Sequence, residues 1–145
     1  MNILLLLKPK CAVAYVNSKN TLRQGLEKMR HHGYKALPVI DDEGIYVGTV
    51  TEGDFLWYMI DRGGACDIHM QEDVYIRDII KKDRTSHVKV DASMTELLHL
   101  CEEQNFAPVT DDRGVFVGMI TRSDVIRYFE NQYDGKENEK NEFRA

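Results

Sequence analysis

The 145-residue sequence lacks the features that define several broad classes of protein. Its three cysteines, Cys11, Cys66 and Cys101, are widely spaced and form no C-x-x-C pair, so neither a disulfide framework nor a cysteine-rich zinc site is indicated. The apolar run Ile3–Leu7 ends at residues 8–10, short of the roughly 7–15 residues of a signal-peptide core or about 20 of a membrane helix. We expect a cytoplasmic protein with reduced thiols, no membrane contact and a buried first element.

An excess of positive charge is also missing. The net charge of -5 at pH 7 argues against a nucleic-acid surface, although a local site on an acidic protein can still hold a small anion. There is no G-x-G-x-x-G motif, nucleophile–base pair, catalytic carboxylate pair or metal cluster, so we expect no catalysis, no metal and no resident cofactor. His31-His32 fits a helix C-terminus, and residues 66–69 fit a solvated linker better than half a metal site.

The strongest positive feature is an internal repeat. Residues 38–59 and 108–129 align without gaps at an offset of 70, and ten aligned positions are identical. Both stretches contain a Pro-Val strand, an Asp-Asp-x-Gly turn, a Val-Gly strand and a Thr-x-x-Asp motif. Chance does not produce this agreement, so the chain is an internal duplication of units of about 70 residues.

Each copy predicts the same order of elements, β-α-β-β-α, which makes the fold class α+β. A short strand precedes a helix with an apolar stripe, and two strands around an Asp-Gly turn lead into a closing helix. The expected strands cover residues 12–16, 37–40, 46–50 and 88–90. The apolar stripe of the first helix consists of Leu22, Leu26 and Met29. That of the equivalent helix in the second copy consists of Met94, Leu98 and Cys101, and Asp91 or Ser93 should cap this helix.

The repeat also sets the expected domain boundaries. The first repeat should cover residues 1–66 and the second residues 67–130, with a short helix near 74–80 leading into the second copy. Residues 131–145 are polar and without apolar periodicity, so we expect a disordered tail or a frayed extension of the last helix.

The Thr-x-x-Asp motifs at Thr51–Asp54 and Thr121–Asp124 stand where a strand ends and a helix begins. One interpretation is structural, because a Thr cap with an acid three residues later resembles a capping box. The other is functional, because a helix N-terminus and a hydroxyl suit a phosphate while a carboxylate suits the two hydroxyls of a ribose. Spacing alone leaves both interpretations open.

Together these motifs resemble a tandem pair of CBS domains, from about residue 3 to 130. The resemblance implies two repeats related by a pseudo-two-fold axis, packed through their sheets, with two clefts that in many such pairs bind adenine nucleotides or S-adenosylmethionine. It assigns Asp54 and Asp124 to the ribose and Thr51 and Thr121 to the phosphate. The base pockets would be lined by Tyr34, Ala36, Leu37 and Pro38, and by Phe106, Ala107 and Pro108.

The two sites should differ. Arg122 lies inside the second motif and suits a phosphate, whereas Glu52 at the matching place in the first would repel one. The loop before Pro108 is two residues shorter than that before Pro38, which should reshape the second base pocket. Either copy is left open as the occupied one.

The expected function is therefore a regulatory sensor, not an enzyme. It would bind AMP, ADP, ATP, cyclic di-AMP or another adenosyl ligand and act in trans on a separate regulated protein. By the same resemblance we expect a homodimer, with Trp57 at a helix interface. The alternative is an interaction or scaffold module whose clefts are degenerate, favoured by Glu52 and the shortened loop.

Overall fold

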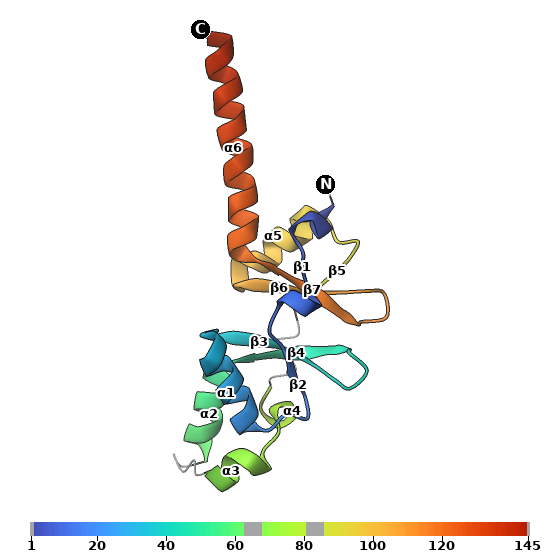
Figure 1. The fold of residues 1–145 in the computed structure, drawn as a ribbon, viewed down its shortest axis with the longest axis vertical. Coiled ribbons are helices and arrows are strands. Elements are labelled where there is room, and N and C mark those ends of the chain that lie inside the picture. The colour runs from blue at the N-terminus through green and yellow to red at the C-terminus, as the bar shows by residue number, and fades with distance from the viewer. Residues whose placement is uncertain (1, 63–67, 81–85, 145) are drawn as a thin grey trace.

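The computed structural model describes residues 2–62, 68–80 and 86–144, and it contains two small mixed sheets with helices beside them (Figure 1). The strand order is β2-β3-β4 in one sheet and β1-β7-β6-β5 in the other. Cys66 and the boundary expected between residues 66 and 67 lie outside the described residues.

The predicted order β-α-β-β-α is confirmed in both copies. The first copy has β2 (Val16–Asn17), α1 (Leu22–His32), β3 (Ala36–Ile40), β4 (Tyr46–Thr51) and α2 (Glu52–Asp61); the second has β5 (Val88–Lys89), α5 (Met94–Glu103), β6 (Phe106–Thr110), β7 (Phe116–Thr121) and α6 (Arg122–Arg144). In each copy the first strand is parallel to the second and the third is antiparallel to it. The strand expected at residues 12–16 is shorter, because the chain first makes a 3₁₀ turn, η2 (Lys10–Ala12).

Local signals explain where the helices begin and end. Thr21 caps α1 through the amide of Gln24, and Gly33 ends it in the left-handed conformation (φ 68°). Of the two caps considered for α5, Ser93 is the one observed, since its hydroxyl accepts from the amide of Glu96 at 3.1 Å. The residue after α5, Gln104, is extended, so the second copy reaches its next strand by a shorter loop.

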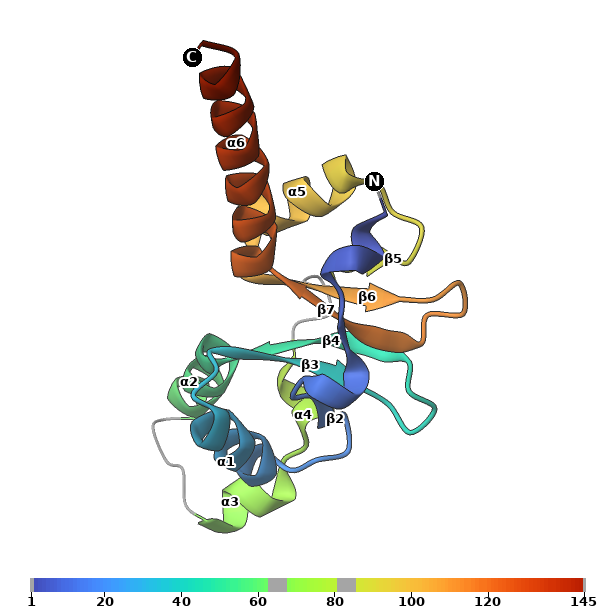
Figure 2. The same cartoon turned by 45° about the horizontal axis from the view of Figure 1, so that its top comes forward.

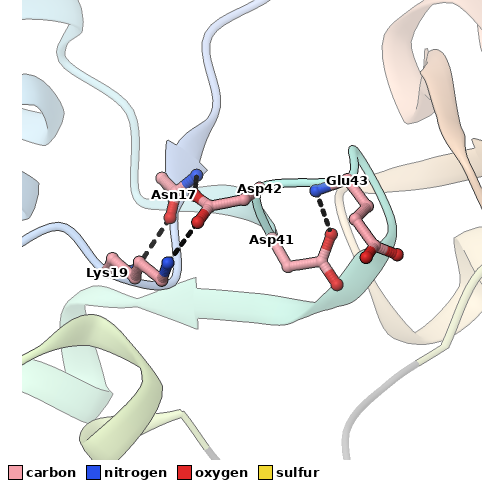
Figure 3. Close-up of polar contacts among 5 residues, drawn as sticks. All are labelled: Asn17, Lys19, Asp41, Asp42 and Glu43. Carbon is pink, nitrogen blue, oxygen red and sulfur yellow. Dashed lines mark hydrogen bonds and ion pairs between the residues drawn. The ribbon is translucent and has the colours of Figure 1, made fainter.

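The acidic turns are held by their first aspartate. The Oδ1 atom of Asp41 accepts from the amides of Glu43 and Ile45 at 2.9 and 3.0 Å, and Asp111 does the same in the second copy. In the second copy the Val115 amide is the main cause of a lowered pKa at Asp111. Figure 3 shows the first turn, where Asp42 also pairs with Lys19 and accepts from Asn17.

The two turns contact each other and join the two sheets. The amide of Tyr46 donates to the Gly114 carbonyl at 3.0 Å, and the amide of Phe116 donates to the Gly44 carbonyl at 2.9 Å. Around these bonds Ile40, Tyr46 and Phe116 form a buried cluster between the sheets. These reciprocal bonds follow the pseudo-two-fold relation expected of the repeats.

The segment that precedes each copy packs against the core of the other copy. The N-terminal segment, η1 (Ile3–Leu6) and β1 (Lys8–Pro9), lies against the second copy, where β1 pairs with β7 (Figure 2). Conversely, α3 (Ile68–Asp73) and α4 (Ile76–Ile79) lie against the first copy, and Ile76 is fully buried in its core. The short helix expected near residues 74–80 is therefore present.

For the C-terminal tail the sequence left open either disorder or a frayed extension of the last helix. Helix α6 continues to Arg144 and extends away from the sheets (Figure 1). Residues 131–144 contain three Glu and two Lys, which favour helix, together with three Asn and one Gly, which do not, and no proline interrupts them. No helix in the described ranges is both long and apolar enough to cross a membrane.

The crossed packing predicts an unequal effect of two substitutions in η1. Ile3 is fully buried in the second core, whereas Leu5 is 76% exposed. We expect Ile3→Ala to lower the free energy of unfolding by about 2–5 kcal/mol, the range for a large buried residue cut to alanine. Leu5→Ala should change it by less than about 0.5 kcal/mol. Equal effects in urea unfolding experiments would contradict the crossed packing.

Candidate functional site

Two clefts lie between the copies, and corresponding elements line both. Cleft A has a volume of about 510 Å³, and its lining residues are Lys35, Ala36, Thr49, Thr51, Ser86, Glu103, Gln104, Asn105 and Phe106. Cleft B has a volume of about 280 Å³, and its lining residues are Lys8, Ala12, Val13, Ala14, Tyr34, Ala36, Leu37, Asn105, Phe106, Met119, Thr121 and Ser123. Thr51 and Thr121 occupy equivalent places in the two clefts.

Each cleft combines residues of both copies. In cleft A, Thr51 of the first copy faces the loop that precedes β6 in the second. In cleft B, Thr121 of the second copy shares a cavity with Tyr34, which belongs to the longer loop of the first. The longer loop of the first copy, which precedes Pro38, and the threonine of the second Thr-x-x-Asp motif therefore lie in one cleft.

The structure brings some of the residues expected at a site to the clefts and keeps others away. Ala36 and Phe106 line both clefts, Thr51 lines cleft A, and Tyr34, Leu37 and Thr121 line cleft B. The remaining expected residues do not line either: Pro38, Ala107 and Pro108 lie within strands β3 and β6, and Asp54, Arg122 and Asp124 point elsewhere.

Asp54 has the structural role that the capping interpretation describes. Its Oδ2 atom accepts from the Thr51 amide at 2.9 Å, and its own amide donates to the Thr51 hydroxyl at 3.2 Å. Both halves of a capping box are therefore made at the start of α2, and the Asp54 side chain is buried. In this conformation its carboxylate stabilises the helix and does not reach cleft A.

Asp124 makes different contacts at the equivalent position. Its Oδ2 atom lies 3.4 Å from Lys8 Nζ, and its Oδ1 atom lies 3.3 Å from Arg127 Nη1. Only its amide repeats the first copy's pattern, donating to the Thr121 hydroxyl at 3.2 Å. The second carboxylate is thus held by two cations, one of which, Lys8, also lines cleft B.

Arg122, expected to meet a phosphate, faces helix α5. Its Nε atom donates to the Cys101 carbonyl at 2.8 Å, and its amide donates to the Asn105 carbonyl, also at 2.8 Å. This hydrogen bond holds the end of α5 next to the start of α6. Burial raises the pKa of the neighbouring Cys101 thiol, so this cysteine favours its protonated form.

Sequence reasoning missed several residues of the clefts. Lys8 reaches cleft B only because β1 crosses to the second copy. Gln104 orders the shortened loop, since its Nε2 atom donates to the carbonyls of Ser86 and Phe106 at 3.1 and 2.9 Å. Ser123 lies within the second Thr-x-x-Asp motif, so its position in the sequence was enough to suggest it.

The charge of the two clefts differs. Cleft A carries both Lys35 and Glu103, whereas Lys8 is the one charged side chain among the described residues that line cleft B. Across residues 2–62, 68–80 and 86–144 there is no group of three or more His, Cys, Asp or Glu side chains placed to hold a metal ion. Cleft B therefore offers an anion a positive charge without a competing carboxylate in its lining.

Comparison with known proteins identifies the family to which the two repeats belong. The CBS domain model matches residues 9–61 and 67–131. This chain belongs to the CBS domain family. The sequence of this CBS pair is 26% identical over 102 residues to that of uncharacterized protein MK0525 from Methanopyrus kandleri. The match covers 69% of this chain and 49% of that protein. The chain thus spans about half the length of this curated relative.

Solved CBS structures confirm the architecture of the pair. CbpB in complex with c-di-AMP superposes with a TM-score of 0.85 at 22% identity, covering 96% of this chain and 91% of that one. CBSX2 in complex with AMP superposes with a TM-score of 0.72 at 22% identity, covering 91% and 98%. At these identities the structures establish the fold, and the ligands belong to those proteins.

The two aspartates of this CBS pair predict a contrast in stability. Asp54→Ala removes a buried acceptor from the Thr51 amide, and we expect the free energy of unfolding to fall by about 1–3 kcal/mol. Asp124→Ala removes ion pairs with two exposed cations, which should lower it by less than about 1 kcal/mol. Chemical denaturation of both variants checks this, and a larger loss for Asp124→Ala would contradict the contacts described.

Proposed function

We propose that this CBS pair is a non-catalytic regulatory sensor that binds an adenine nucleotide between its repeats and signals to a separate protein in trans. The single observation that supports this most is the composition of cleft B. There Tyr34, Thr121 and Lys8 line one cavity. An aromatic ring suits a base, and a hydroxyl with a cation suits a phosphate.

The start of α6 adds to this fit. Thr121 and Ser123 stand at the helix N-terminus, where free amides and the helix dipole favour negative charge. Asp124 lies in the first turn, and it pairs with Lys8, which lines the cleft; the proposal requires its side chain to turn from this pair to the ribose. In this proposal AMP, ADP, ATP and cyclic di-AMP are all candidate ligands, and CBS relatives carry AMP or c-di-AMP.

A second candidate function, a scaffold module with degenerate clefts, is favoured by cleft A. The Asp54 carboxylate is used by its capping box, and Glu103 places negative charge where a phosphate would lie. These features oppose a nucleotide in cleft A specifically. We therefore propose cleft B as the occupied site and cleft A as the weaker or empty one.

Calorimetric titration with AMP, ADP, ATP and cyclic di-AMP tests the sensor. We expect saturable heat with at least one of them. Asp124→Asn should weaken that binding by about tenfold or more, because a charged hydrogen bond to the ribose contributes roughly 1.5–3 kcal/mol. Thr51→Ala, which changes cleft A, is the matched control and should leave the affinity nearly unchanged.

Two outcomes of these titrations count against the proposal. Absence of binding to every nucleotide at millimolar concentration would favour the scaffold function. Formation of a hydrolysis product in the same samples, followed by chromatography, would replace the sensor with an enzyme.

We also propose that the protein is a homodimer through the closing helices. Helices α2 and α6 lie along the same side of the molecule (Figure 1), and both carry exposed apolar residues; those before the distal end of α6 are Leu56, Trp57, Ile60, Ile126, Phe129 and Tyr133. Trp57 alone is 54% exposed, and exposed apolar side chains of this size are typical of an interface. A second copy would present the same face and cover it by two-fold symmetry.

Light scattering on the protein eluting from a sizing column tests the dimer. We expect a mass near twice 16.8 kDa for the natural sequence. Trp57→Glu with Ile126→Glu should shift it to the monomer, because charge buried in an apolar interface is costly. Phe143→Glu, at the far end of α6 and 94% exposed, should leave the dimer intact. A monomeric natural protein would contradict the proposal.

A further inference from the structure

We propose that Lys8 is the phosphate-binding cation of cleft B, and that its pair with Asp124 is a latch that the nucleotide opens. In the free protein Lys8 holds the Asp124 carboxylate; in the complex the phosphate takes Lys8, and Asp124 turns to the ribose hydroxyls. This inference rests on the proposed function, and it adds a residue outside the repeated motif together with a link to the N-terminal segment.

The backbone places Lys8 firmly beside the cleft. Strand β1 pairs antiparallel with β7, with Lys8 opposite Met119 and Pro9 opposite Gly118. A Cβ atom at Gly118 would lie 2.1 Å from the Lys8 carbonyl oxygen, so only a residue without a side chain lets the two strands approach this closely. Since β7 ends at Thr121, Lys8 is carried next to the hydroxyl expected to meet the phosphate.

The Lys8 side chain connects the cleft to the carboxylate. Lys8 lines cleft B, Asp124 does not, and the two charged groups are 3.4 Å apart. Lys8 is 50% exposed, so its ion pair is weak and readily exchanged for another anion. Arg127 also contacts Asp124, at 3.3 Å, but it does not line the cleft and can remain on the carboxylate when Lys8 leaves.

Electrostatics explains why the exchange favours a phosphate. A nucleotide phosphate near Thr121 would be repelled by the Asp124 carboxylate unless a cation lay between them. Among the described lining residues of cleft B, Lys8 is the one side chain with that charge. A nucleoside without phosphate gives Lys8 no new partner, so Lys8 should discriminate between adenosine and AMP.

The latch also gives the N-terminal segment a role in regulation. The Asp124 carboxylate, Arg127 and the apolar residues Leu5, Leu6 and Leu7 line one shallow depression beside α6. Moving Lys8 from Asp124 to a ligand changes the contact that ties this segment to α6. The state of cleft B is thereby transmitted to the partly exposed surface of η1, away from the ligand itself.

Calorimetric titrations of AMP and adenosine into the natural protein and Lys8→Met test the inference. We expect Lys8→Met to weaken AMP binding by about tenfold or more, and to leave adenosine binding unchanged or tighter because Lys8 no longer holds Asp124 away from the ribose, so the ratio of the AMP affinity to the adenosine affinity falls. Retained adenosine binding shows that the variant is folded. Lys8→Arg keeps the charge and should retain most of the AMP affinity.

Two lysines serve as matched controls for the same loss of charge. Lys10 lies in the same segment with its Nζ atom 5.2 Å from the centre of the Tyr15 ring, and Lys35 lines cleft A. Lys10→Met and Lys35→Met should leave AMP binding near that of the natural protein.

The outcomes separate this inference from the proposed function. If the natural protein binds AMP and Lys8→Met keeps the same ratio of AMP to adenosine affinity, the latch is wrong and the sensor stands. If Lys35→Met loses AMP instead, the phosphate lies in cleft A and the latch is again wrong. If the natural protein binds none of the nucleotides, the proposed function itself fails.

Discussion

The crossing of the N-terminal segment onto the second copy is the constraint on which the rest of the structure depends. Ile3 completes the apolar core of the second repeat, while Ile76 completes that of the first. Each repeat of about 70 residues is small for an independent core, and the exchange makes the two cores mutually dependent. Gly118 has no side chain, so β1 can pair closely with β7. The same crossing therefore places Lys8 at cleft B.

The duplicated motif shows how identical residues acquire different roles. Asp54 and Asp124 both stand three residues after a helix-capping threonine, yet one is buried in a closed capping box and the other pairs with Lys8 and Arg127. The first arrangement stabilises a helix and leaves the carboxylate little freedom. The second pairs the carboxylate with two exposed cations, one of which lines cleft B. A duplication can thus keep its fold in both copies while the charges around the repeated motif differ.

Sequence patterns were sufficient for the fold because each element carries its own local signal. The 3.6-residue stripe from Leu22, the Thr51 cap and the Asp41-to-Gly44 turn all act over a few residues. The site was predicted less completely, since the partners of Arg122 and the approach of Lys8 depend on contacts between distant segments. The tail, for which the sequence left disorder and an extension of the last helix open, is helical to Arg144; it buries little, so apolar periodicity could not decide between the two.

Net charge and local charge therefore act separately in this protein. The chain carries -5 overall, and that excess sits largely on exposed helices and turns, where water screens it. The lining of cleft B holds one lysine, no carboxylate and three hydroxyl-bearing residues, so the local charge there is positive although the whole chain is negative. A ligand changes the molecule only through contacts that differ between its free and bound states. The Lys8–Asp124 pair is such a contact, because its two charges cannot both keep each other and satisfy a phosphate and a ribose.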